Sequence, residues 1–116
     1  MVDMINQERV AAGVNPLKVD LGLASVGRAK ANDMKTNNYF SHTSPTYGSP
    51  FDMMKQVGIT YSGAGENIAR TQSVESAMTG FMNSPGHKAN ILNPSFTHVG
   101  IGIAGDFYAQ EFMQAR

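Results

Sequence analysis

The sequence predicts a single α+β domain in which helices pack on an antiparallel sheet. Segments with apolar residues at helical spacing are interleaved with β-prone, glycine-containing stretches. The clearest strand pairing is a hairpin near the C-terminus, whereas a parallel sheet would need βαβ crossovers. A chain of 116 residues without an internal repeat is long enough for one domain with its own core.

The composition excludes several classes of function. Lys plus Arg number 9, as do Asp plus Glu, and the charges are scattered, so we expect no nucleic-acid partner and no anionic membrane. The absence of Cys excludes disulfides and thiolate chemistry. No apolar stretch approaches the roughly 20 residues that span a bilayer. Charged residues interrupt the first positions, so any export signal is expected to have been removed from this chain.

The first two helices are predicted from their ends. Residues 2–12 form a helix that stops at Gly13. Asn6 and Arg9 share one face of it, and they either lie in solvent or tie the helix to the body by hydrogen bonds. Asp20 is a favourable N-cap for the second helix. Its apolar stripe contains small residues that permit close packing, at Leu23, Gly27, Ala31 and Met34.

Two more helices follow an irregular loop. The segment "NNYFSHTSPTYGSP" is expected to be exposed and to present His42, while Tyr39 and Phe40 pack back into the core. Ser49 and Pro50 start a short helix, and Ser73 caps the next one. That fourth helix carries an amphipathic stripe of Val74, Ala77, Met78 and Phe81.

The strands come from the remaining β-prone stretches. "ITYSGAGENIA" predicts a strand that runs into a glycine-rich loop presenting Glu66. "THVGIGIA" and "FYAQEFM" predict a hairpin across Gly105-Asp106. The alternation in the first of these two places Val99, Ile101 and Ile103 inward.

Three residues could carry chemistry. His87 lies in the first turn of a short helix after Ser84 and Pro85, where the helix dipole favours a neutral imidazole able to bind a metal or act as a base. Any polar residue could occupy such a first turn, and from this feature alone the ordinary helix-start residue is the favoured interpretation. His42 is either a site residue or a solvated loop residue, and Glu66 is either an exposed turn acid or a group that the glycines bring close to a ligand. Spacing alone does not show that His42, Glu66 and His87 lie in one site, because no contiguous motif such as HExxH is present.

The segments "GENIA", "NSPGHKANILNPSFTHVGIG" and "YAQEF" resemble the bacterial branch of the CAP superfamily, the cysteine-rich secretory, antigen and pathogenesis-related proteins, also called SCP-like domains. The resemblance extends to "INQERVAAGVNPLKVD", "DMKTNNYFSHTSP" and "VGIGIAG", and so covers nearly the whole chain. It implies a three-layer α-β-α sandwich with a small antiparallel sheet between helix layers. It also implies that residues 1–116 form one such domain within a longer exported protein.

The resemblance implies a central cavity lined by two histidines and two acids. Its histidines fall on His42 and His87, and the acid of its Gly-Glu-Asn motif falls on Glu66. The second acid of the larger eukaryotic members falls on Ser84, and the Trp that precedes it falls on Phe81. Ser84 is therefore expected to cap the short helix rather than to line an acid and histidine cluster.

The resemblance further implies a divalent metal, zinc, held by His42 and His87, with Glu66 acting through a water or a ligating imidazole. The expected function is an extracellular module that holds an unidentified cell-envelope, lipid or peptide ligand. One alternative is a zinc-assisted or His/Glu-dependent hydrolase with catalytic His42, Glu66 and His87. It is disfavoured because no nucleophile or oxyanion-hole donor is identified, and two histidines make a weaker zinc site than three ligands. The other alternative is a structural domain of the cell surface or spore coat.

Overall fold

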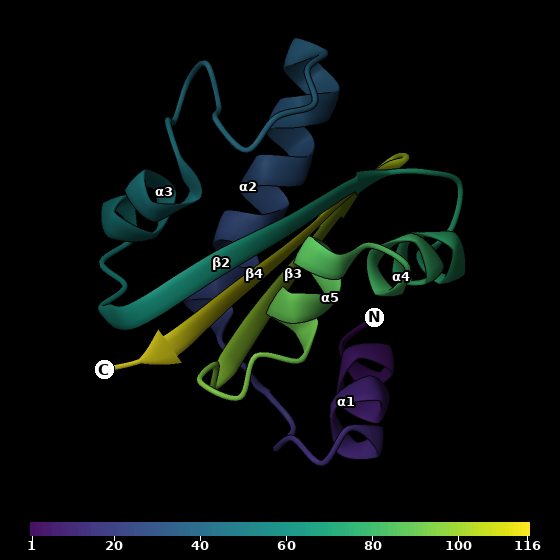
Figure 1. Cartoon of the computed structure of the whole chain (residues 1–116). Helices are drawn as coiled ribbons and strands as arrows, with labels where there is room; N and C mark the ends of the chain where they lie inside the picture. The colour runs from purple at the N-terminus through teal and green to yellow at the C-terminus, as the bar shows by residue number, and fades with distance from the viewer.

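A four-stranded sheet lies between two layers of helices in the computed structural model of the chain, which describes residues 1–116 (Figure 1). The strand order is β1-β3-β4-β2. The strands are β1 (Lys18–Val19), β2 (Tyr61–Arg70), β3 (His98–Ala104) and β4 (Phe107–Ala115). Strand β4 pairs antiparallel with β2 and β3, and the two-residue β1 pairs parallel with β3. The predicted α+β sandwich is confirmed, with β1 as the one parallel addition to an otherwise antiparallel sheet.

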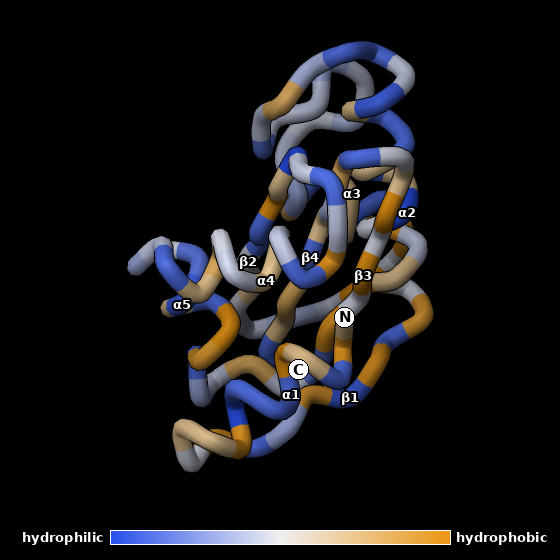
Figure 2. The backbone as a smooth tube through the Cα atoms, turned by 90° about the vertical axis from the view of Figure 1, so that its right-hand side faces the viewer, coloured by the Kyte–Doolittle hydropathy of each residue, from blue (hydrophilic) through white to orange (hydrophobic).

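The helices divide between the two faces of the sheet. Helices α2 (Leu21–Asn37) and α3 (Pro50–Gln56) cover one face, and α1 (Val2–Ala11), α4 (Val74–Met82) and α5 (Pro85–Ile91) lie over the other (Figure 1). Hydrophobic segments run along the strands in the middle of the molecule, whereas the loop between α2 and α3 is mostly polar (Figure 2). No helix has the length and apolar character needed to cross a membrane.

The hairpin agrees with the sequence, except at one side chain. Ala104 pairs with Phe107 across the predicted two-residue turn, where Gly105 has a φ of 59°. Val99 is fully buried, but Ile103, which the alternation predicts to face the core, is 46% exposed. Ile103 pairs with Tyr108 close to the turn, at the end of the hairpin.

Helix α2 lies directly on the sheet because glycines line the contact. A Cβ at Gly102 would collide with the backbone of Gly27, and a Cβ at Gly100 would collide with the backbone of Leu23. Only residues without a side chain allow this approach. Leu23 and the residues that follow it in α2 are therefore held at a fixed height above strands β3 and β4.

Asn6 and Arg9 tie the first helix to the body of the domain by hydrogen bonds and do not lie in solvent. Asn6 exchanges two hydrogen bonds with the backbone of Leu17, at 3.1 and 2.8 Å. Arg9 is fully buried, and its guanidinium donates to four carbonyl oxygens, those of Asn15, Ile91, Asn93 and Phe96. These contacts fix α1 to the segment that follows α5.

Two expectations about the loop regions are wrong. Glu66 lies in the middle of strand β2 rather than in a loop, because the neighbouring glycine does not make a bend. Gly65 keeps an extended backbone, and its missing side chain makes room for Asn90 and Phe96, which a Cβ would approach to 3.0 and 3.2 Å. Phe40 is 51% exposed and does not join the core.

Candidate functional site

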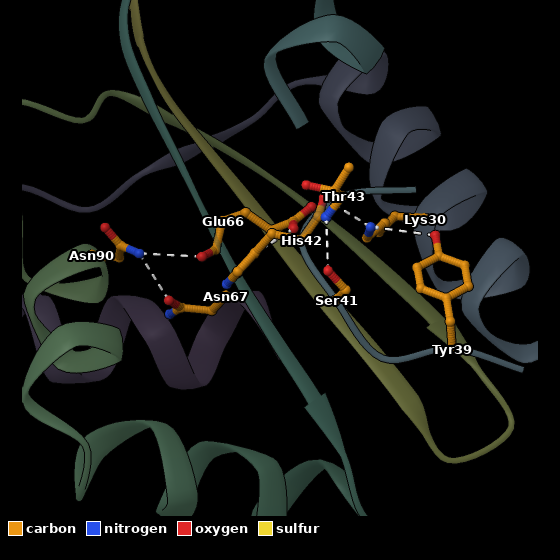
Figure 3. A network of polar contacts seen from close by, with 8 residues as sticks. All are labelled: Lys30, Tyr39, Ser41, His42, Thr43, Glu66, Asn67 and Asn90. Carbon is orange, nitrogen blue, oxygen red and sulfur yellow. Dashed lines mark hydrogen bonds and ion pairs between the residues drawn. The ribbon is translucent and has the colours of Figure 1, made fainter. Parts of the chain in front are cut away.

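The loop that carries His42 is held by two buried polar residues of α2. The Lys30 ammonium donates to the backbone oxygen of His42 at 3.0 Å and to the Tyr39 hydroxyl at 3.3 Å (Figure 3). Asp33 accepts hydrogen bonds from three donors, Asn37, Tyr39 and Ser44, each at 2.5 Å. The loop is irregular in conformation but is anchored to the helix at both of these points.

Burial and charge shift the pKa values of this anchor. Burial raises the pKa of Asp33, but the hydrogen bonds from Ser44, Tyr39 and Asn37 outweigh it and leave that pKa below its ordinary value. Burial and the hydrogen bond to Asp33 raise the pKa of Tyr39 to about 12. Burial lowers the pKa of Lys30, opposed by the charges of Glu66, Glu111 and Asp33.

His42 and Glu66 form a direct pair. The Nδ1 of His42 lies 2.7 Å from Oε1 of Glu66. The side chain of His42 is 54% exposed, whereas that of Glu66 is only 1% exposed. A carboxylate can only accept, so the pair places the proton on Nδ1 and leaves the lone pair of Nε2 free for a ligand.

The next residue of the same strand holds the second histidine segment. Successive side chains of a strand point to opposite faces, so Asn67 faces α5 while Glu66 faces α2. Asn67 Nδ2 donates to the backbone oxygen of His87 at 3.1 Å and to Gln110 Oε1 at 3.0 Å. Asn90 of α5 donates to Asn67 Oδ1 at 2.9 Å and to the backbone oxygen of Glu66 at 3.3 Å (Figure 3). Strand β2 therefore positions both histidine segments, one on each side.

His87 lies beside a pocket at the edge of β2. Its Nδ1 is 2.8 Å from Ser84 Oγ, and its ring packs against Phe81 with 5.2 Å between centroids. The pocket has a volume of about 350 Å³ and is lined by β2 and α4 together with Ser84 and His87. Burial, and then the charge of His42, lower the pKa of His87 and favour the neutral imidazole. Ser84 occupies the N-cap position as expected, but its side chain bonds His87 instead of capping the helix.

A buried acid that the sequence did not single out completes this region. Glu111 lies directly opposite Glu66 in the β2–β4 register and is fully buried. Neither oxygen of Glu111, nor Oε2 of Glu66, has a hydrogen-bond partner among the other groups of the chain. Burial, and then the nearby carboxyl group of Glu66, raise the pKa of Glu111 well above its ordinary value, and the charge of Lys30 opposes this shift.

Lys30 and Glu111 are not among the predicted site residues, and the sequence holds a signal only for Lys30. Lys30 lies seven positions after Leu23, on the apolar stripe of its helix, where a charged residue must be buried or must interrupt the core. Glu111 lies between Ala109 and Met113 in a strand, on the face that α2 covers. The position of Lys30 on the apolar stripe therefore predicts its burial, whereas nothing in the sequence of the strand marks the side on which Glu111 lies.

The three predicted site residues are thus only partly brought together. His42 contacts Glu66, whereas His87 contacts Ser84. The relation between the two histidines is electrostatic, because the charge of His42 lowers the pKa of His87. The pocket beside His87 is lined by neither His42 nor Glu66. No group of three or more His, Cys, Asp or Glu side chains is placed to hold a metal ion.

The chain is similar to two Bacillus proteins over nearly its whole length. The chain is 52% identical over 116 residues to the uncharacterized protein YkwD of Bacillus subtilis (strain 168), covering 97% of this chain and 45% of YkwD. A crystal structure of an extracellular protein containing an SCP domain from Bacillus anthracis str. Ames superposes with a TM-score of 0.95 at 38% identity, covering 97% of this chain and 38% of that one. This chain therefore spans less than half of either relative.

A more distant structure supports the fold. An outer surface protein from Borrelia burgdorferi has a TM-score of 0.92 at 19% identity, covering 99% of this chain and 90% of that one. The family model described as CAP, the cysteine-rich secretory protein family, matches residues 2–114. With its α-β-α sandwich and the residues around His42, Glu66 and His87, this chain belongs to the CAP family.

Proposed function

We propose that this chain is an extracellular binding module whose site is built around His42, Glu66 and His87. The observation that carries the proposal is that the Nδ1 atom of each histidine is held by a side chain. Glu66 Oε1 holds His42 at 2.7 Å, and Ser84 Oγ holds His87 at 2.8 Å. Hydrogen bonds of this kind orient imidazoles for binding at their other nitrogen. Similarity to the extracellular protein from Bacillus anthracis supports the location.

The pocket beside His87 offers space for part of the ligand. Its volume of about 350 Å³ lies at the lower end of the range for small-molecule sites. Ile68, Ala77 and Phe81 give it an apolar wall, and Ser84 and His87 add polar groups. A cell-envelope, lipid or peptide ligand with an apolar part and a few hydrogen-bonding groups fits this lining.

The proposed site includes a divalent metal, zinc, and its support is the chemistry of two oriented imidazoles whose charges influence each other. With Nδ1 of His42 and Nδ1 of His87 both engaged, their Nε2 atoms are the donors that would hold zinc, and Glu66 and Ser84 would orient the rings. Bound zinc would offer open positions to water or to a ligand group. Two protein ligands are fewer than in most zinc sites, so we expect modest affinity.

Zinc titration by calorimetry on the metal-free protein tests this proposal. We expect saturable binding with a Kd of about 1 μM, equivalent to about −8 kcal/mol. His42→Ala and His87→Ala should each abolish it. His98→Ala is the matched control, because His98 lies on β3 and is bonded to Thr97 rather than to the site. Absence of zinc binding, or binding that survives both substitutions, contradicts the metal site.

A hydrolase is the second candidate, favoured by the 2.7 Å contact between His42 and Glu66. An imidazole oriented by a carboxylate can take a proton from water at its free nitrogen. Glu66→Gln separates the two functions, because a hydrolase should bind its substrate and lose turnover, whereas a binding module should keep its ligand. Loss of stability in His42→Ala without loss of any ligand would indicate the structural domain instead.

A further inference from the structure

The pairing of Glu66 and Glu111 leaves an unusual hydrogen-bonding deficit. The two residues lie directly opposite each other in β2 and β4, so their side chains are on the same face of the sheet. Their three unpartnered oxygens are the only buried side-chain polar atoms of the chain without a hydrogen-bond partner. Unpaired buried polar atoms are costly, so a fold that retains three together requires an explanation.

No other side chain supplies the missing donor. Lys30 is the only cation packed against the pair, and its ammonium donates instead to Tyr39 and to the His42 backbone. Asp33, the other charged group on this face of α2, is itself an acceptor for three donors. A proton carried by one of the two carboxyl groups would supply a donor within the pair.

We infer that Glu111 is a positioning residue for His42: as a carboxylic acid it donates a hydrogen bond to Oε2 of Glu66, which holds Oε1 of Glu66 against Nδ1 of His42. This single proton gives partners to Glu66 Oε2 and to one oxygen of Glu111. It also keeps Glu66 an acceptor toward His42, so that His42 carries its proton on Nδ1 and presents Nε2 outward. The raised pKa of Glu111 agrees with this arrangement.

The consequence for binding rests on the proposed function. If the Nε2 of His42 contributes to a zinc site, the chain from Glu111 through Glu66 to His42 is what prepares it. Removing outer partners of metal-binding histidines typically lowers metal affinity by 10- to 100-fold. Because Glu111 acts through Glu66, we expect the lower end, about tenfold.

The first test is NMR on the metal-free protein. The side-chain carboxyl carbon of Glu111 should resonate as a carboxylic acid at neutral pH, and the ring nitrogens of His42 should report the Nδ1–H tautomer. Glu111→Leu should shift His42 toward a mixture of tautomers. Glu111→Gln should preserve the Nδ1–H tautomer, because its amide can still donate to Glu66. Gln110→Leu is the matched control, since Gln110 is equally buried on the same strand but faces α5.

Two results would overturn the inference. One is a carboxylate signal for Glu111 in the wild-type protein at neutral pH, which needs no variant to fold. The other is a folded Glu111→Leu protein with wild-type His42 ring shifts. Zinc titrations of the same proteins then measure the tenfold loss. A wild-type protein that binds no zinc would contradict the metal site of the proposed function, while the tautomer result would still decide the role of Glu111.

Discussion

The carboxylate of Asp33 and the hydroxyl of Ser44 lie 2.5 Å apart, and this contact joins helix α2 to the loop that carries His42. Ser44 is only 3% exposed, although the residues on both sides of it are exposed. Its Oγ also accepts hydrogen bonds from the backbone of Thr46 and Tyr47. One buried serine therefore fixes the shape of the loop and its position against the helix.

Asp33→Asn should destabilise the protein by about 1–3 kcal/mol, because the amide replaces one of the two acceptor oxygens with a donor that faces other donors. Urea unfolding of both proteins measures the difference. Asp106→Asn is the control, since Asp106 pairs with Arg70 where both side chains are at least half exposed, at 50% and 55%. That change should cost less than about 1 kcal/mol. Equal effects of the two substitutions would contradict the role of Asp33.

The lowered pKa of His87 predicts a loss of stability in mild acid. The unfolded chain takes up the proton near its ordinary pKa of about 6.5, whereas the folded protein resists it. The stabilising effect of the neutral ring is therefore full above about pH 6.5 and declines as the pH falls below that value. The melting temperature of the wild type, measured with a chelator present, should fall relative to that of His87→Gln as the pH is lowered below about 6.5. A constant difference would contradict the prediction.

Gly102→Ala should destabilise the protein by about 1–3 kcal/mol or prevent folding, because the added methyl collides with the backbone of Gly27 and cannot rotate away. Chemical denaturation measures the change. Gly80→Ala provides the control, since a Cβ there meets no atom within 4 Å and the residue lies in helix α4. That substitution should raise stability by up to about 1 kcal/mol. A neutral Gly102→Ala would show that α2 can move off the sheet.

Arg9→Lys should cost about 2 kcal/mol or more, although it keeps the charge. The planar guanidinium donates to four carbonyl oxygens from three nitrogens. The lysine ammonium has three donors on one nitrogen and cannot reach all four oxygens. Arg28→Lys, on the exposed side of α2, should change stability by no more than about 0.5 kcal/mol. Thermal unfolding of both variants tests the difference, and similar melting temperatures would refute a structural role for Arg9.

Much of the fold could be predicted because its signals are local. Asp20, Ser49 and Ser73 accept hydrogen bonds from backbone groups three residues later, as the caps predicted. The turn at Gly105 follows in the same way from adjacent residues. Family resemblance supplied the sandwich and identified His42, Glu66 and His87, which periodicity and spacing could not unite.

Tertiary structure decided the roles of the buried charges. Strand β4 is covered on both faces, so all residues from Phe107 to Met113 are buried and no polar alternation marks the side on which Glu111 lies. Its partner Glu66 becomes visible only in the β2–β4 register. Arg9 resembles a surface residue until its hydrogen-bond partners are supplied by other segments, and the sequence does not show which groups pair with Lys30. The sequence by itself determined where helices and the hairpin begin and end, because those signals act within a few residues. The environment of each carboxyl group and imidazole depends on segments far along the chain, and only their packing set it.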